Sequence, residues 1–105
     1  MRMTYPTAIV LHAVAHGVRH GFDIINASGL RAGTVYPILR RLEAEGLVSS
    51  VWERAMRAHA EGRPPRRNYR VTAAGKKALS EALLRYPGVT RILETRGGDA
   101  TPASA

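Results

Sequence analysis

The stretch GTVYPILRRLEAEGLV, residues 33–48, decides the fold. Its apolar side chains recur at i, i+3, i+4 and i+7, the spacing of one helix face: Val35, Ile38, Leu39 and Leu42. At about 100° per residue, Arg40 and Arg41 fall on the opposite, outward face. Gly46 then ends the pattern. The stretch therefore predicts a helix over residues 32–45 with a buried face and a basic outward face.

Pro37 leaves the start of this helix open. If the helix begins at Ala32, the Pro37 ring removes one hydrogen bond and crowds the carbonyl of Gly33. If Thr34 caps the helix instead, Pro37 lies in the first turn, where it costs little. Both starts are compatible with the sequence.

Two shorter helices are expected before this stretch. Residues 6–17 begin with Pro6, which suits a first helical position, and they carry a broad apolar face. Residues 20–28 end at Gly29, where a left-handed stop is expected. Because only a tight turn separates residues 20–28 from the next helix, the pair predicts a helix-turn-helix.

Two strands are expected after it, over residues 47–53 and 68–72, and in the second of them Tyr69 and Val71 alternate with polar residues. The segment between them contains Gly62, Pro64 and Pro65, and we interpret it as a long basic loop, too polar and too broken to join the core. A hairpin with a basic tip that follows a third helix is typical of a wing. In this hairpin Trp52, the only tryptophan, is interpreted as a packing residue rather than a ligand platform.

The C-terminal part reads as a further helix over residues 73–86, capped by Thr72. Pro87 and Gly88 break or kink it, and one or two more turns follow. Its leucines and Tyr86 exceed what one side of a lone surface helix needs, so they predict a dimer interface or, alternatively, a cap on the monomer's own core. We expect residues 1–72 to form a winged helix-turn-helix domain, residues 73–96 a dimerisation helix and residues 97–105 a disordered tail. The fold class is mainly α with a small β-hairpin.

The charge balance favours a nucleic-acid partner. Sixteen Lys and Arg residues stand against eight Asp and Glu, a net charge of +8. The excess is +2 over residues 1–54 and +6 over residues 55–105. Nearly all of these cations are arginine, whose planar fork suits phosphates and guanine edges. A basic surface that is merely solvated is the alternative interpretation.

A helix fits the major groove of B-DNA, and side chains on its outward face reach base edges. Groups near its start donate to phosphates, where the helix dipole also helps. A basic wing lies along the backbone or enters the minor groove. The predicted DNA-binding residues are Arg31, Thr34, Tyr36, Arg40, Arg41, Arg63, Arg66 and Arg67. Alternatively, the helix arginines pair with Glu43 or Glu45, and the wing is only solvated.

The tract over residues 33–48, followed by GRPPRRNYRVTAAGKKAL over residues 62–79, resembles the PadR family of transcriptional regulators, in particular its branch with a short C-terminal tail. The resemblance runs from Tyr5 to Leu84. It implies a winged helix, a C-terminal helix that pairs two subunits, and repression of a palindromic operator that a small-molecule or metal effector relieves. Two departures are Arg31, where a small polar cap is common, and the break at Pro87 and Gly88.

Catalysis is not expected, because the chain has no cysteine, only two aspartates and no nucleophile or phosphate-loop motif. His12, His16 and His20 recur every four residues, a spacing that suggests metal chelation, but His20 starts another helix. We therefore predict no metal site and no cofactor.

The alternative function is a non-specific basic nucleic-acid-binding or ribosome-associated protein. A winged helix used only for protein contacts is a third. The sequence shows neither a secretion signal nor an apolar run long enough for a membrane span, so we expect a cytoplasmic protein without a membrane partner.

Overall fold

The computed structural model describes residues 2–100, with side chains up to Glu94. In chain order, the elements are α1 (Tyr5–Ala15), α2 (Gly21–Ser28), α3 (Ala32–Ala44), β1 (Val48–Trp52), α4 (Ala55–Ala60), β2 (Arg67–Val71), α5 (Ala73–Arg85) and α6 (Val89–Ala100). The chain is mostly helical with one antiparallel two-stranded hairpin, which confirms the predicted fold class.

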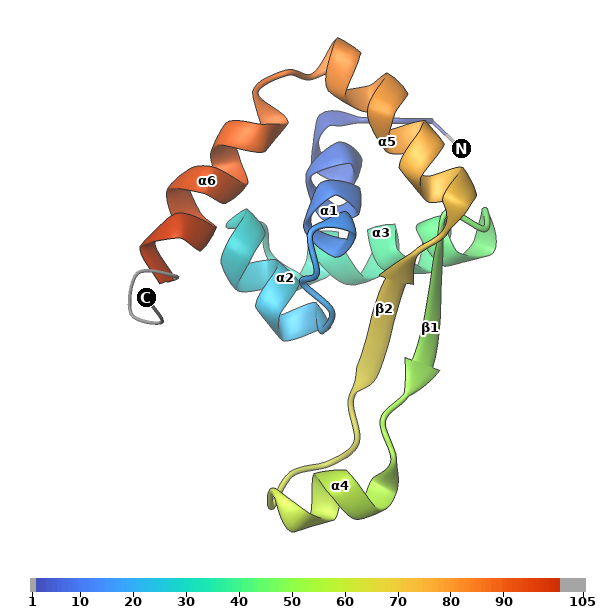
Figure 1. Cartoon of the computed structure of the whole chain (residues 1–105), viewed down its shortest axis with the longest axis vertical. Helices are drawn as coiled ribbons and strands as arrows, with labels where there is room; N and C mark the ends of the chain where they lie inside the picture. Colours follow the sequence, from blue (N-terminus) through green and yellow to red (C-terminus); the bar gives the residue numbers. More distant parts are fainter. Residues whose placement is uncertain (1, 101–105) are drawn as a thin grey trace.

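Helix α1 runs through the middle of the molecule, and the other large helices surround it (Figure 1). The Thr4 hydroxyl caps its start by accepting a hydrogen bond of 3.3 Å from the backbone N–H of Thr7. Residues 7–14 of α1 are all buried, because neighbouring helices cover every side of it. Its apolar residues form the centre of the core with those of α2, α3 and the hairpin.

Helix α3 begins at Ala32, with Arg31 as the residue that precedes its first turn. Thr34 is therefore not the cap, and Pro37 lies inside the helix. No side-chain hydrogen bond caps this start, which fits the absence of a small polar residue there. The predicted apolar face is confirmed, since its four residues are at most 5% exposed.

The two strands pair from Val48 opposite Val71 to Trp52 opposite Arg67. The hairpin projects away from the helical body and carries α4 at its tip (Figure 1). We refer to residues 48–71 as the wing. The prediction of an irregular tip is wrong for residues 55–60, which form α4. Alanine-rich sequence favours a helix even over a short stretch, and Ala58 is fully buried within the tip.

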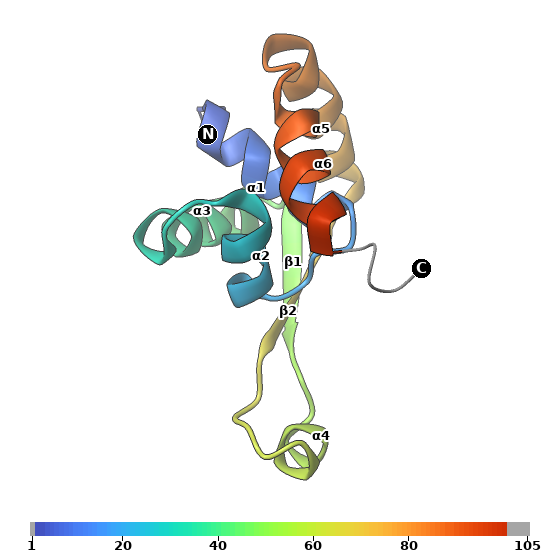
Figure 2. The ribbon, with the colours of Figure 1, turned by 90° about the vertical axis from the view of Figure 1, so that its left-hand side faces the viewer.

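The C-terminal segment consists of two helices rather than one, separated by residues 86–88. Thr72 is confirmed as the cap of α5, since its hydroxyl accepts a hydrogen bond of 3.0 Å from the backbone N–H of Gly75. After the break, α6 folds back beside α1 and α2 (Figures 1 and 2). Helix α6 continues to Ala100, so residues 97–100, expected in the tail, are helical, and residues 101–105 lie outside the described part.

Much of the apolar surface of the C-terminal helices packs on the chain's own core. Ala82 and Val89 form a second buried cluster with Ala8 and Ile9 of α1. Leu84, by contrast, is 87% exposed. The C-terminal segment is thus part of the same folded unit as the winged helix, and α5 leaves one large apolar side chain uncovered.

Candidate nucleic-acid interface

The exposed face of α3 carries Tyr36, Arg40 and Arg41. The helix lies on one side of the molecule, while α5 and α6 lie on the other (Figure 2). Two flanks of this face point to different neighbours. Tyr36 and Arg40 face the wing. Thr34 and Arg41 line a shallow hollow beside the start of α1. The predicted helix residues therefore form two groups rather than one.

A concave surface of about 420 Å³ lies between the start of α2, the wing-facing flank of α3 and the inner face of the wing. We call it the wing hollow. Its lining residues are His20, Gly21, Phe22, Asp23, Tyr36, Arg40, Trp52, Arg66, Arg67 and Tyr69. The structure thus brings together four of the predicted DNA-binding residues, Tyr36, Arg40, Arg66 and Arg67. Arg31, Thr34, Arg41 and Arg63 are not among its lining residues.

Strand register explains which wing residues line the hollow. Directly paired residues share a face of an antiparallel hairpin, so Trp52 and Arg67 lie on the same face as Ser50 and Tyr69. The Ser50 hydroxyl donates a hydrogen bond of 2.6 Å to Oε2 of Glu43, which fastens β1 to α3. Tyr69 is buried at 7% exposure, and burial raises the pKa of its hydroxyl, which therefore stays neutral.

Helix α2 approaches α3 closely at one point of the hollow. A Cβ on Gly21 would lie 2.5 Å from the Tyr36 ring, well inside van der Waals contact. Glycine at this position therefore lets the ring rest against the first turn of α2, where Tyr36 remains 42% exposed. Arg40, one turn further along α3, forms no ion pair with the side chains that the structure describes, so the alternative of an internally paired Arg40 loses its support.

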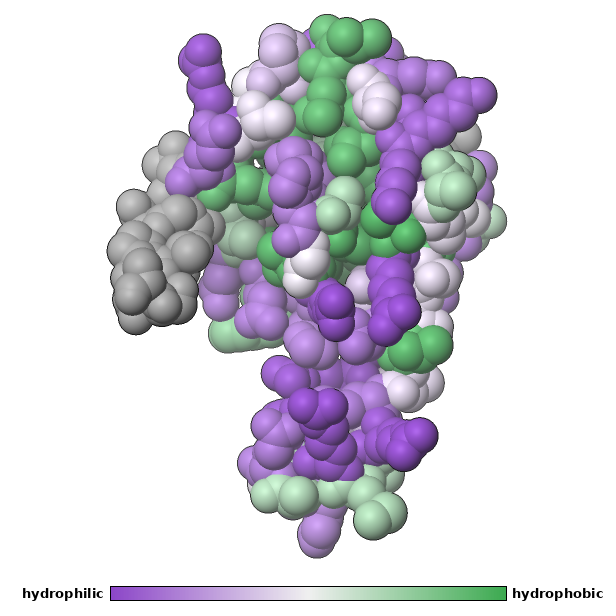
Figure 3. All heavy atoms as spheres, in the orientation of Figure 1, coloured by the Kyte–Doolittle hydropathy of each residue, from purple (hydrophilic) through white to green (hydrophobic). Residues whose placement is uncertain are grey.

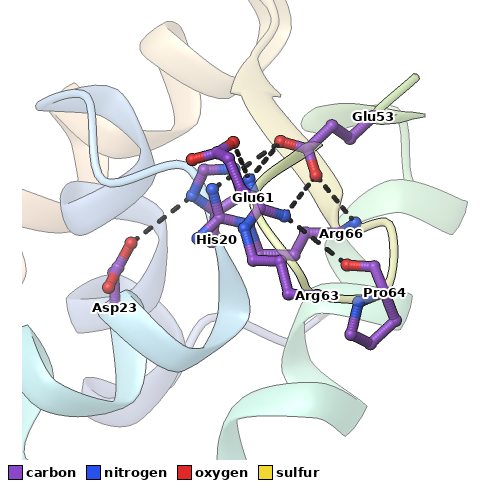
Figure 4. A network of polar contacts seen from close by, with 7 residues as sticks. All are labelled: His20, Asp23, Glu53, Glu61, Arg63, Pro64 and Arg66. Atoms are coloured by element: carbon purple, nitrogen blue, oxygen red, sulfur yellow. Dashed lines mark hydrogen bonds and ion pairs between the residues drawn. The ribbon is translucent and has the colours of Figure 1, made fainter. Parts of the chain in front are cut away.

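Glu53 holds the tip of the wing together through two arginines (Figure 4). Its carboxylate accepts hydrogen bonds from both terminal nitrogens of Arg63, one of them at 2.8 Å, and one from the backbone N–H of Arg66 at 3.4 Å. Arg63 also donates to Glu61 at 2.7 Å. These hydrogen bonds lower the pKa of Glu53 to about 2 and raise that of Arg63 further above its ordinary value.

The ion pairs divide the wing arginines into two kinds. The charge of Arg63 is neutralised inside the wing, and its side chain is only 23% exposed. The Arg66 side chain is 43% exposed, and its guanidinium forms a longer ion pair of 3.7 Å with the Glu53 carboxylate. Arg67 lies on the inner face, and its guanidinium is 5.2 Å from the centroid of the Trp52 ring. Direct contact of Arg63 with DNA stays a prediction. The two ion pairs of Arg63 argue against it, because they already neutralise its charge.

Two aromatic residues of the hollow were missed as candidates. Phe22 is 68% exposed at the start of α2, and Trp52 is 64% exposed on the wing. The interpretation of Trp52 as a packing residue is wrong. Strand alternation normally buries one face, but this hairpin extends past the helical body, so the end of its inner face meets solvent instead of core.

The three histidines of residues 12–20 do not form one cluster, although the ring centroids of His12 and His16 lie 4.0 Å apart. His12 is 5% exposed, and the backbone carbonyl of His12 lies 3.0 Å from Nδ1 of His16. His20 lies 3.4 Å from Asp23 instead. Within residues 2–94, no three His, Cys, Asp or Glu side chains lie close enough to hold a metal ion. No helix among the described residues is long and apolar enough to cross a membrane.

An exposed helix beside a basic hairpin, both fixed to a three-helix core, defines a winged helix-turn-helix DNA-binding protein. The family model described as "Transcriptional regulator PadR-like family" matches residues 10–81. The chain therefore belongs to the PadR-like family of transcriptional regulators, which confirms the resemblance seen in the sequence.

Individual relatives agree with this assignment. The chain is 40% identical over 77 residues to the transcriptional regulator Rv3488 of Mycobacterium tuberculosis, a match that covers 69% of this chain and 66% of that protein. A PadR family regulator from Clostridium difficile R20291 superposes with a TM-score of 0.68 at 18% identity, over 88% of this chain and 97% of the other. BpsR of Bordetella bronchiseptica superposes with a TM-score of 0.67 at 20% identity, over 86% and 60%. The chain is a DNA-binding transcriptional regulator and not an enzyme.

Proposed function

We propose that this chain represses transcription as a homodimer that occupies a palindromic operator and that a small-molecule or metal effector releases. The observation that carries the proposal is the wing hollow, where Tyr36 and Arg40 of α3 face Arg66 and Arg67 of the wing. With α3 in a major groove, the wing arginines reach the flanking backbone. Basic groups from two elements on one concave surface match the negative charge of a duplex.

A second copy is supported by size and by exposed apolar surface. One module this small covers little DNA, and two-fold pairing doubles the contact and reads a palindrome. Leu84 of α5 is 87% exposed. Beside α5 lies a hollow of about 340 Å³ lined in part by Met3, Leu47, Ala78 and Ala82. These features make α5 the proposed dimerisation element, as the family resemblance implies.

Regulation by an effector is supported by a protein of similar fold. DNA binding by BpsR is regulated by 6-hydroxynicotinic acid. In the proposed dimer, an effector that favours a different separation of the two α3 helices lowers operator affinity by its differential affinity for the two arrangements. The repressor sign rests on the family resemblance.

The test is operator discrimination. Footprinting on the region upstream of the chain's own gene locates a candidate operator, and its affinity is compared with that of random-sequence duplex and RNA at physiological salt. We expect the operator to bind at least about 10³-fold more tightly. Equal affinity for all three nucleic acids contradicts the proposal and supports the non-specific alternative.

A further inference from the structure

The wing hollow contains more aromatic surface than charge recognition requires. Phe22 and Trp52 are each more than 60% exposed, and Tyr36 adds a third partly exposed ring. Exposed rings that converge on a concave surface mark a contact site. Elsewhere the surface of the wing in the view of Figure 3 is mainly hydrophilic. The rings therefore require an occupant with apolar as well as anionic groups.

The proposed docking identifies that occupant. Helix α3 and the wing each contribute a wall of the hollow, and the start of α2 contributes the rest of its lining. If α3 lies in a major groove and the wing on the minor-groove side, one DNA strand separates the two grooves. That strand has to run between the two protein walls, because they stand on either side of it. The hollow is the space between α3 and the wing through which this strand would pass.

We infer that the wing hollow seats one sugar–phosphate strand of the duplex, with deoxyribose against the rings of Trp52 and Phe22 and flanking phosphates on Arg66 and Arg67. The inference rests on the proposed docking of α3 and the wing. A deoxyribose offers apolar C–H edges, which pack against an aromatic face, and phosphates accept hydrogen bonds from guanidinium groups.

The remaining polar groups fit this occupant. The Arg67 guanidinium lies 5.2 Å from the centroid of the Trp52 ring, so an apolar ring and a cationic group stand side by side in the hollow. Tyr69 also lines the hollow, and burial raises the pKa of its hydroxyl, which stays neutral. Asp23 is the acidic group of the lining, and its carboxylate lies 3.4 Å from Nδ1 of His20.

The inference separates an apolar contribution to affinity from an ionic one. Contact with deoxyribose does not depend on base sequence, so random-sequence duplex is a sufficient probe and no operator is needed. Trp52→Ala should weaken this binding about tenfold, the effect of roughly 50 Å² of apolar surface losing its cover. The salt dependence should stay that of the wild type, whereas Arg67→Gln should lower the slope by about 0.9.

Two further variants complete the design. Trp52→Phe keeps a ring for both the sugar and Arg67 and should recover most of the affinity. Val51→Ala is the matched control, because Val51 is 61% exposed on the same strand but paired with Asn68 on the opposite face. It should bind as the wild type does.

Wild-type protein supplies an independent measurement. Trp52 is the only tryptophan, so its emission reports the hollow directly, and saturating duplex should protect it from acrylamide quenching. The inference is overturned if bound DNA leaves the quenching unchanged, or if Trp52→Ala binds as tightly as the wild type. It is also overturned if Trp52→Ala lowers the salt slope as Arg67→Gln does. If the wild type binds random duplex but prefers no operator over it, the result contradicts the proposed function and leaves this inference intact.

Discussion

The Glu53 carboxylate accepts a hydrogen bond of 2.8 Å from Nη2 of Arg63, ten positions further along the chain. This contact closes the tip of the wing, since Glu53 follows β1 and Arg63 follows α4. The same carboxylate accepts from the backbone of Arg66 just before β2. A negative charge therefore sits near the tip of a DNA-binding element, where charge alone opposes binding. Its position suggests that it stabilises the shape of the wing before DNA arrives.

Glu53→Gln distinguishes these two effects, because they have opposite signs. Loss of a repulsive charge alone strengthens binding to random duplex. Loss of a pre-formed wing weakens it, and we expect a decrease of roughly fivefold, the cost of ordering about one long side chain on binding. Fluorescence anisotropy of a labelled duplex measures the change, and limited proteolysis should cleave the variant wing faster.

The matched control is Glu61→Gln, which removes the same charge from the same wing but leaves the Glu53 contacts in place. Its affinity should rise slightly. If the affinity of Glu53→Gln for random duplex also rises, the wing does not need the Glu53 contacts to keep its shape. The pKa of Glu53 is about 2, against an ordinary 4.5, and these two values bound the pH range over which its ion pair is lost. The ion pair stabilises the fold fully above pH 4.5, and its contribution is lost as the pH falls towards 2.

Arg40 and Arg66 should differ in what they contribute to DNA binding. Arg40 lies on α3, within reach of base edges, so Arg40→Ala should weaken operator binding by about 1–3 kcal/mol and random duplex much less. Arg66 is placed for a phosphate, so Arg66→Ala should weaken both and lower the salt slope by about 0.9. Titrations over a salt series measure both quantities. Arg70→Ala, exposed on the outer face of the hairpin, serves as the control, and equal losses for Arg40→Ala and Arg66→Ala on every sequence rule out this division.

Leu84→Lys should convert the proposed dimer into a monomer without unfolding it. The side chain is 87% exposed, so the free energy of unfolding of the monomer should change by less than about 0.5 kcal/mol. A charged group at the centre of an apolar contact, however, costs its desolvation. Sedimentation velocity at micromolar concentration measures the state. Met56→Lys, equally exposed on α4, should remain dimeric, and a monomeric wild type rejects the dimer outright.

His12 should make stability depend on pH. Its ring is buried in α1 with an unpartnered Nδ1, and the His16 ring centroid is 4.0 Å away. Burial, followed by repulsion from His16, lowers the pKa of His12 below 6.5. The unfolded chain therefore binds a proton at His12 more readily than the folded chain does. The free energy of unfolding is thus highest above pH 6.5 and decreases as the pH falls below 6.5.

Urea unfolding at pH 7.5 and 5.5 measures the slope of the free energy of unfolding against pH. His12→Leu should reduce the slope, because the substituted residue takes up no proton on unfolding. His59→Gln, which alters an exposed histidine of α4, should keep it. A slope that survives in His12→Leu assigns the titration to another group.

The sequence by itself determined the helical core, the hairpin and the identity of the α3 residues that point outward. These follow from local periodicity and caps: the stripe from Val35 to Leu42, the Thr72 cap and the stop at Gly29 each need only a few neighbouring residues. The family resemblance had the same local source, since its motifs are contiguous.

Only the tertiary structure decided which of those residues act together. Arg63 and Arg67 look alike in the sequence, but one is neutralised by Glu53 and the other lies over Trp52. Trp52 is exposed because the hairpin extends beyond the helical core. Helix α6 packs against α2 because the chain turns back after Tyr86. Such outcomes depend on contacts between residues distant in sequence, and no local pattern encodes the length of a hairpin relative to the core that it leaves.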